Sequence, residues 1–123
     1  MYAAFSEIAG GRDIAAYVAT YYEPDAEYQP VEEAEAVQGH EALVGWHRRW
    51  FDAWNEFRAK PDEVLTKDEV VFAAVSTQAR GGGSGTEVEQ RFYHVTDVRN
   101  GRIGRIREYL DRNEALAAAG LLE

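Results

Sequence analysis

The stretch that decides the fold is 87-EVEQRFYHVTDVRNGRIGRIREYL-110. An Asn-Gly pair at 100–101 separates two segments in which apolar and polar residues alternate, which is typical of a β-hairpin. Two turns fit this sequence. A two-residue turn with both Asn100 and Gly101 at positive φ would place His94 opposite Arg107, whereas a type I turn with Gly101 as a bulge residue would place His94 opposite Ile106.

Apolar patterning favours the bulged turn. On the second strand, the alternate face with two arginines is the better solvent face, and on the first strand the face that contains Tyr93 and Val95 is the more charged one. Matching apolar face to apolar face requires the bulged register, because a slip of one residue reverses every side chain. The inner face of the hairpin is then predicted to carry Phe92, His94, Ile106, Glu108 and Leu110.

In this register His94 and Glu108 are diagonal neighbours, about 7–8 Å apart at Cβ. On an apolar wall each would lose its charge by desolvation unless it were paired with the other. A paired His and Glu can exchange a proton near neutral pH, which is the chemistry of a general acid–base catalyst. The alternative is a buried His–Glu pair that only stabilises the core.

The rest of the chain predicts helices followed by strands. Residues 5–22 indicate a helix interrupted at Gly10-Gly11, with Asp13 as the N-cap of its second part. After a short extended segment, 26–30, and an acidic loop, 31–38, the apolar spacing predicts a helix over Gly39–Phe57. Later extended segments follow at 57–65 (an edge strand, because of Pro61), 69–80, 86–98 and 102–110, with the glycine-rich run 81–85 as a hairpin tip and a closing helix capped by Asp111 and Gly120. This order predicts one α+β domain over residues 1–123.

Tryptophans at four-residue intervals line one face of the long predicted helix. Trp46, Trp50 and Trp54 form a broad apolar wall, with His47 beside it. Most walls of this kind are core, and a partly open cavity beside the rings is the functional alternative.

Composition excludes several classes of function. With 22 acidic and 13 basic residues the net charge is −9, which disfavours nucleic acid and anionic membranes as partners. The absence of cysteine excludes thiolate catalysis and zinc ribbons, and three scattered histidines show no metal-ligand spacing, so no cofactor is expected. No apolar run reaches about 18 residues and no signal-peptide pattern opens the chain, so we expect a cytoplasmic protein.

Four segments together resemble the SnoaL-like branch of the nuclear-transport-factor-2-like superfamily. They are Gly39–Leu43 at the start of the Trp-bearing helix, Val88–Val95, Asn100–Ile103 and Arg107–Arg112. The resemblance covers nearly the whole chain and implies a cone-shaped fold, a cystatin-like roll, in which a curved antiparallel sheet wraps around the N-terminal helices. It also implies a deep apolar pocket at the open end and a homodimer.

The resemblance gives mixed implications for chemistry. Ketosteroid isomerase has an Asp base at the position that matches Gln29, an oxyanion-hole Tyr at that of Phe5 and a protonated Asp at that of His94, so its chemistry does not transfer. Polyketide cyclases place a His on the penultimate strand and a carboxylate on the last, which His94 and Glu108 match, with Glu in place of Asp.

The resulting hypothesis is a small-molecule pocket protein, an acid/base enzyme of polyketide-cyclase or isomerase/dehydratase type. Glu108 would remove a proton next to the carbonyl of an apolar ligand, His94 would stabilise the enolate, and Gln29 would donate an N–H to a ligand oxygen. Substrate-binding side chains would be Trp46, His47, Trp50, Phe92, Ile106 and Leu110. The alternative is a non-catalytic ligand-binding or dimeric interaction module with the same fold.

Overall fold

A computed structural model describes residues 13–31, 33–81 and 87–121, with the backbone alone at 54–57 and 81. The predicted α+β fold is confirmed. In chain order the elements are α2 (Ile14–Tyr21), β1 (Tyr22–Gln29), β2 (Val37–Gln38), α3 (His40–Asp52), β3 (Trp54–Lys67), β4 (Val70–Gly81), β5 (Glu87–Arg99), β6 (Arg102–Tyr109) and α4 (Arg112–Ala118). Phe5, the Gly10-Gly11 break and positions 82–85 of the glycine-rich run lie outside the described residues.

The six strands form one curved sheet in the order β2-β1-β6-β5-β4-β3. Strands β3 to β6 form an antiparallel meander, as expected, but β1 runs parallel to β6, so the sheet is mixed rather than wholly antiparallel. β1 lies between β2, with which it pairs antiparallel, and the last strand, β6. The pairing with β6 brings residues near 28 next to residues near 106.

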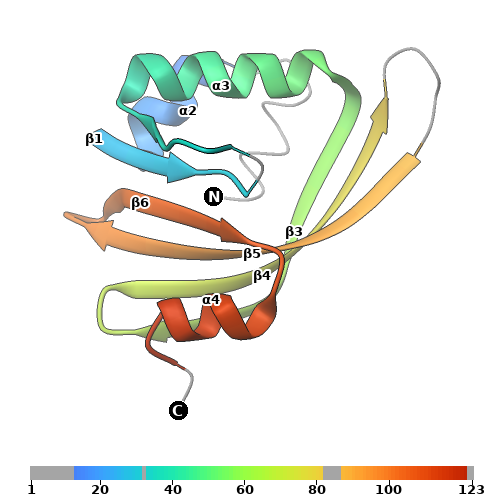
Figure 1. Cartoon of the computed structure of the whole chain (residues 1–123). Helices are drawn as coiled ribbons and strands as arrows, with labels where there is room; N and C mark the ends of the chain where they lie inside the picture. The colour runs from blue at the N-terminus through green and yellow to red at the C-terminus, as the bar shows by residue number, and fades with distance from the viewer. Residues whose placement is uncertain (1–12, 32, 82–86, 122–123) are drawn as a thin grey trace.

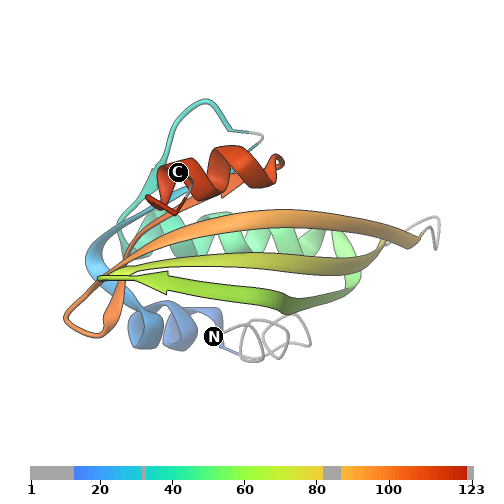
Figure 2. The same cartoon turned by 90° about the horizontal axis from the view of Figure 1, so that it is seen from below.

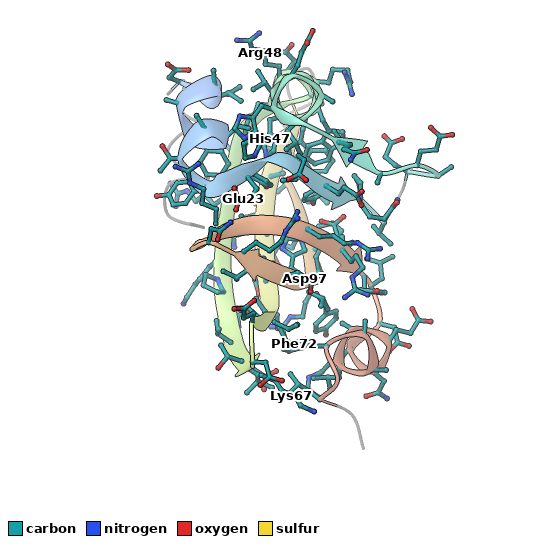
Figure 3. The ribbon with its side chains drawn as sticks, turned by 90° about the vertical axis from the view of Figure 1, so that its left-hand side faces the viewer. Glu23, His47, Arg48, Lys67, Phe72 and Asp97 are labelled. Carbon is teal, nitrogen blue, oxygen red and sulfur yellow. The ribbon has the colours of Figure 1, made fainter. Side chains whose placement is uncertain are left out.

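Helices cover both faces of the sheet. Figures 1 and 2 show α2 and α3 on one face and α4 on the other. Under α2 and α3 lies an apolar core that includes Tyr17, Tyr22, Leu43 and Ile106, and under α4 lies a second one built around Phe72. Figure 3 shows Phe72 on the side of the sheet near α4.

The second core corrects one prediction. Tyr93 and Val95 were expected on a solvent face, yet Val95 is fully buried and packs with Phe72 under α4. This face is buried because the closing helix covers it with the apolar side chains of Ala115 and Leu116. An alternation pattern identifies two faces but does not show that a short terminal helix will cover the second one.

Helix caps follow the sequence closely. The Asp13 carboxylate accepts a hydrogen bond from the Ala16 N–H, and the Asp111 carboxylate accepts from the N–H groups of Asn113 and Glu114. Gly120 has φ +74° and the Leu121 N–H donates to the carbonyl of Leu116, which closes α4 as predicted.

The long helix is shorter than its apolar spacing predicted. It ends at Asp52 instead of residue 57, and β3 begins at Trp54. The edge strand with Pro61 is confirmed, with a register shift between Pro61 and Glu63. Apolar residues near 54–57 fit either a helical or a strand period over so short a stretch, which is why the helix was extended too far.

The register of the β5–β6 hairpin was predicted wrongly. Asn100 (φ 54°) and Gly101 (φ 75°) both adopt the left-handed conformation, so the turn is the two-residue type that patterning disfavoured. A bulge then follows, because Val98 pairs with Ile103 while Asp97 pairs with Arg105, leaving Gly104 as the extra residue.

The bulge has two consequences. Glu108 lies directly opposite His94, whereas a diagonal arrangement was predicted. A two-residue turn without the bulge would place Glu108 on the other face of the sheet. Ile103, assigned to the solvent face, points into the core beside Tyr22. The predicted shared face of His94 and Glu108 is therefore correct, although the turn that produces it is not.

Candidate functional site

The centre of the candidate site is the pair formed by His94 on β5 and Glu108 on β6. Nε2 of His94 lies 2.8 Å from Oε2 of Glu108, and the side chains are 12% and 9% exposed. A carboxylate can only accept hydrogen bonds, so Nε2 carries the proton. When the ring is neutral, its lone pair is therefore on Nδ1.

Tyr28 on β1 completes the group. Its hydroxyl donates to the same Oε2 of Glu108 at 2.7 Å, and its ring lies edge-on to that of His94. The parallel pairing of β1 with β6 sets Tyr28 beside Ile106. Ile106 lies two residues before Glu108, on the same face of β6. Tyr28 was not predicted as a site residue, and its neighbour Gln29 was, although the two-residue spacing of Ala26 and Tyr28, both buried in the structure, indicates the correct face of β1.

The other carboxylate oxygen is also occupied. Oε1 of Glu108 accepts a hydrogen bond of 3.2 Å from the backbone N–H of Val31, just beyond the end of β1. Glu108 thus receives three donors from three different parts of the chain.

These donors determine the charge of Glu108. Burial by itself raises the pKa of the carboxyl, but the hydrogen bond and charge of His94, with the hydrogen bonds from Tyr28 and Val31, outweigh it and bring the pKa below its usual range. Glu108 is therefore an anion at neutral pH and a weak base. This electrostatic environment suits a group that orients and stabilises an imidazolium better than one that removes a proton.

An aromatic stack adjoins the group. The ring centroids of Trp46 and Tyr28 are 4.8 Å apart, and Trp46 is stacked on Trp50 with their centroids 5.7 Å apart. The three rings therefore form a continuous row from α3 to the site. Trp46 is only 8% exposed, because these rings pack on each other.

The structure places the predicted substrate-binding residues at different depths. Ile106 is buried beside Tyr28, and Phe92 is half-buried one pleat along β5 from His94. Leu110 is 54% exposed, because β6 ends at Tyr109 and the inner-face alternation stops there. Leu110 is thus not brought into the group.

His47 lies deep between α3 and the sheet (Figure 3) and not at an opening. Its Nδ1–H donates to the carbonyl of Leu43 at 2.7 Å, and aromatic rings of Tyr17, Tyr22 and Trp46 surround it. Burial lowers the pKa of His47, although its hydrogen bond to Leu43 acts in the opposite direction. It is a neutral core histidine.

Gln29 also lies apart from the pair. Its Nε2 donates to the carbonyls of Glu33 at 2.7 Å and Pro30 at 3.2 Å, and β1 alternation directs it to the face opposite Tyr28. The catalytic role expected from the resemblance, an N–H offered to a ligand oxygen, has no support in this geometry.

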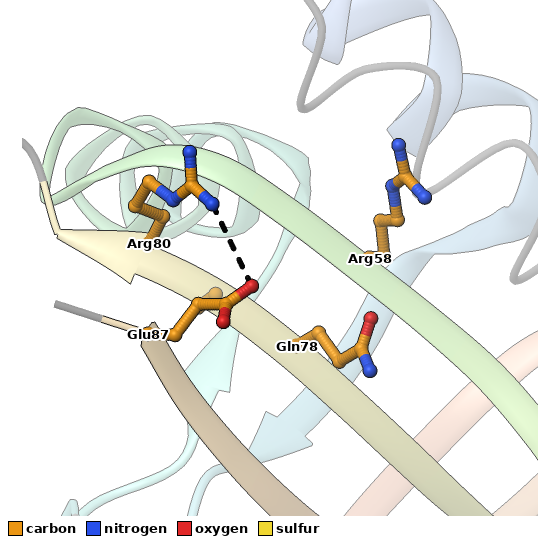
Figure 4. A pocket seen from close by; sticks show the side chains of 5 residues that line it. Arg58, Gln78, Arg80 and Glu87 are labelled. Carbon is orange, nitrogen blue, oxygen red and sulfur yellow. Dashed lines mark ion pairs between the residues drawn. The ribbon is translucent and has the colours of Figure 1, made fainter. Parts of the chain in front are cut away.

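Two depressions in the described surface lie away from this group. One of about 340 Å³ is lined by residues of β4 and β5 that include Ser76 and Arg91. The other, of about 130 Å³ (Figure 4), is lined by Arg58, Gln78, Ala79, Arg80 and Glu87. Both have polar, charged walls, and the deep apolar pocket implied by the resemblance stays a prediction.

Within the described segments, no three His, Asp or Glu side chains are grouped as metal ligands. None of the helices in the same segments has the length and apolarity needed to cross a bilayer.

Comparison with protein-family models gives a match to the SnoaL-like domain over residues 2–106. The chain belongs to the SnoaL-like family. No curated protein matches the sequence significantly.

Solved structures share the fold at low sequence identity. A protein of ketosteroid isomerase-like fold from Catenulispora acidiphila DSM 44928, in complex with trimethylamine, is 18% identical, with 97% of this chain and 91% of that chain covered and a TM-score of 0.76. The epoxide hydrolase/cyclase-like enzyme SalBIII, with a role in pyran ring formation in salinomycin, is 17% identical (89% and 87% covered, TM-score 0.72). TerC, crystallised with polyporic acid, is 20% identical (96% and 90% covered, TM-score 0.73).

Proposed function

We propose that this SnoaL-like protein binds a small carbonyl-bearing molecule and transfers a proton next to its carbonyl, with His94 as the acid/base group. The observation that carries the proposal is the 2.8 Å contact between His94 and the buried Glu108, which accepts three hydrogen bonds. Structural neighbours that include a cyclase-like enzyme and a protein crystallised with a small molecule support a ligand-binding or cyclase-type role.

The proposal reverses the roles expected from the sequence. His94 accepts the proton from the carbon next to the ligand carbonyl through Nδ1 and becomes an imidazolium. Glu108 stabilises that imidazolium and fixes its tautomer, as a carboxylate does for a catalytic histidine. His94 then returns the proton to the enolate, so the His94 ring and the ligand both end neutral while Glu108 remains an anion.

The experiment is proton exchange at the ligand carbon. Aromatic ketones are incubated with the protein in D₂O, and loss of the α-proton signal is followed by NMR. His94→Gln should slow the exchange by about 100-fold or more, the usual loss for a general acid–base group. His40→Gln is the matched control, because His40, at the start of α3, bonds the backbone carbonyl of Tyr22 and is not part of the Glu108 group. An exchange rate unchanged in His94→Gln would contradict the proposal.

A second function, binding without catalysis, is favoured by the packing of the aromatic row. Trp46 lies between Tyr28 and Trp50 and is almost fully buried, as expected where side chains occupy the place of a ligand. Ligands that raise the melting temperature of the wild type without any α-proton exchange would favour this module. The homodimer implied by the resemblance is part of the same proposal, and sedimentation equilibrium tests it.

A further inference from the structure

Gln29 closes the turn that follows β1. Its Nε2 donates to the carbonyls of both Pro30 and Glu33, while the Glu33 N–H donates to the Pro30 carbonyl at 3.3 Å. One carboxamide therefore ties two carbonyls of this turn together. Since Gln29 pairs with Arg107 on β6, the tied turn starts one residue from Glu108 on the neighbouring strand.

The turn presents a backbone donor to the site. Val31 belongs to no strand, so its N–H has no ladder partner there and its direction depends on the turn. That N–H reaches Oε1 of Glu108 at 3.2 Å. With Oε1 held by Val31, Oε2 is the oxygen that His94 and Tyr28 share.

We propose that Gln29 is a positioning residue, whose carboxamide holds the carbonyls of Pro30 and Glu33 together so that the Val31 N–H binds Glu108 and keeps Oε2 directed at His94. Its contribution to proton transfer rests on the proposed function of His94. The hydrogen bond to Glu108 does not, and it can be tested without any ligand.

The groups that face Glu108 determine what a loss of this bond would do. They are His94 from β5, the Tyr28 hydroxyl from β1 and the Val31 N–H from the turn. All three stabilise the anion, so removing the Val31 donor should raise the pKa of Glu108. It should also expose the Val31 N–H to water.

The experiment is NMR of the full chain. In the wild type, the chemical shift of the Val31 amide proton should change with pH in parallel with the chemical shift of the Glu108 carboxyl carbon. In Gln29→Ala, amide exchange at Val31 should accelerate about tenfold or more, which corresponds to a loss of about 1.4 kcal/mol of protection. The Glu108 carboxyl should titrate at higher pH than in the wild type.

Gln78→Ala is the matched control. Gln78 is an exposed glutamine on β4 that bonds Glu89, and its loss should change neither signal at the site. Unaltered Val31 exchange and Glu108 titration in a folded Gln29→Ala protein would overturn the positioning role. If that variant does not fold, a wild-type Val31 shift that fails to follow Glu108 would overturn it equally.

Turnover separates the two proposals. If His94 transfers the proton, Gln29→Ala should lower the α-proton exchange rate about tenfold and shift its pH profile. A shifted Glu108 titration without any exchange activity in the wild type would uphold the role of Gln29 and contradict that of His94.

Discussion

Two ion pairs of nearly equal length lie on opposite faces of the sheet. His94–Glu108 spans 2.8 Å under α2 and α3, and Arg91–Asp62 spans 2.9 Å on the face that α4 leaves open. The first pair is 12% and 9% exposed, the second 54% and 30%. Distance alone therefore does not distinguish a site from a solvated surface pair.

The surroundings make the difference. Asp62 retains contact with water, and its other partner is the Ser76 hydroxyl, so the pair with Arg91 contributes little to stability. Glu108 has lost nearly all its water and depends on three protein donors. Removal of a partner should be costly only on the buried face.

The largest expected effect tests this contrast directly. Glu108→Gln removes the buried anion and should lower the free energy of unfolding by about 3 kcal/mol, since the neutral amide keeps one acceptor oxygen but places an NH₂ donor against groups that donate to the carboxylate. Asp62→Asn, which breaks the exposed pair, should cost less than about 1 kcal/mol. Urea unfolding at pH 7 measures both, and equal losses would mean that burial does not separate the two pairs.

The turn that aligns the buried pair gives the next largest effect. Gly101 has φ +75°, and a β-branched residue is strained there, so Gly101→Val should destabilise the protein by about 2 kcal/mol. Gly101→Asn should recover most of that loss, because Asn tolerates the left-handed conformation. Equal unfolding free energies for the two variants would show that the hairpin can adopt another turn.

Acid should destabilise the protein through two groups, His47 and Glu108, whose windows begin at different pH values. The pKa of His47 is lowered by burial, so the unfolded chain takes up a proton first and stability falls as the pH drops below 6.5. The pKa of Glu108 is also lowered in the folded state, so its contribution, complete above pH 4.5, is lost as the pH falls through the folded value. Each group contributes a slope of at most about 1.4 kcal/mol per pH unit.

Two variants assign the windows. His47→Leu should flatten the dependence just below pH 6.5, and Glu108→Gln should flatten it below about pH 4.5. Urea unfolding across this range provides the measurement. A wild-type curve that is flat from neutral to acid pH would contradict both assignments.

Sequence reasoning reached the α+β fold, the meander and the shared face of His94 and Glu108. It missed Tyr28 because the parallel pairing of β1 with β6 joins residues about 80 positions apart, and no local pattern specifies that register. It also misplaced Gln29, whose side chain binds its own turn. Apolar alternation identifies which face is buried, whereas donors such as the Val31 N–H depend on tertiary geometry.

The smallest effect concerns the bulge that puts Glu108 on the buried face. A Cβ at Gly104 would meet Nε of the Arg99 guanidinium, but Gly104 is not in the left-handed region, so alanine fits once that flexible side chain moves. Gly104→Ala should therefore cost less than about 1 kcal/mol, through loss of the Arg99 hydrogen bond to the Gly104 carbonyl at 3.2 Å.

A double-mutant cycle separates this local effect from a change of register. If alanine only displaces Arg99, then Arg99→Ala should cost about the same as Gly104→Ala, and the double variant should add little to either. The NMR contact between the His94 ring and Glu108 should persist in all three. A large additional loss, or disappearance of that contact, would mean that the bulge itself requires glycine and that the buried pair depends on it.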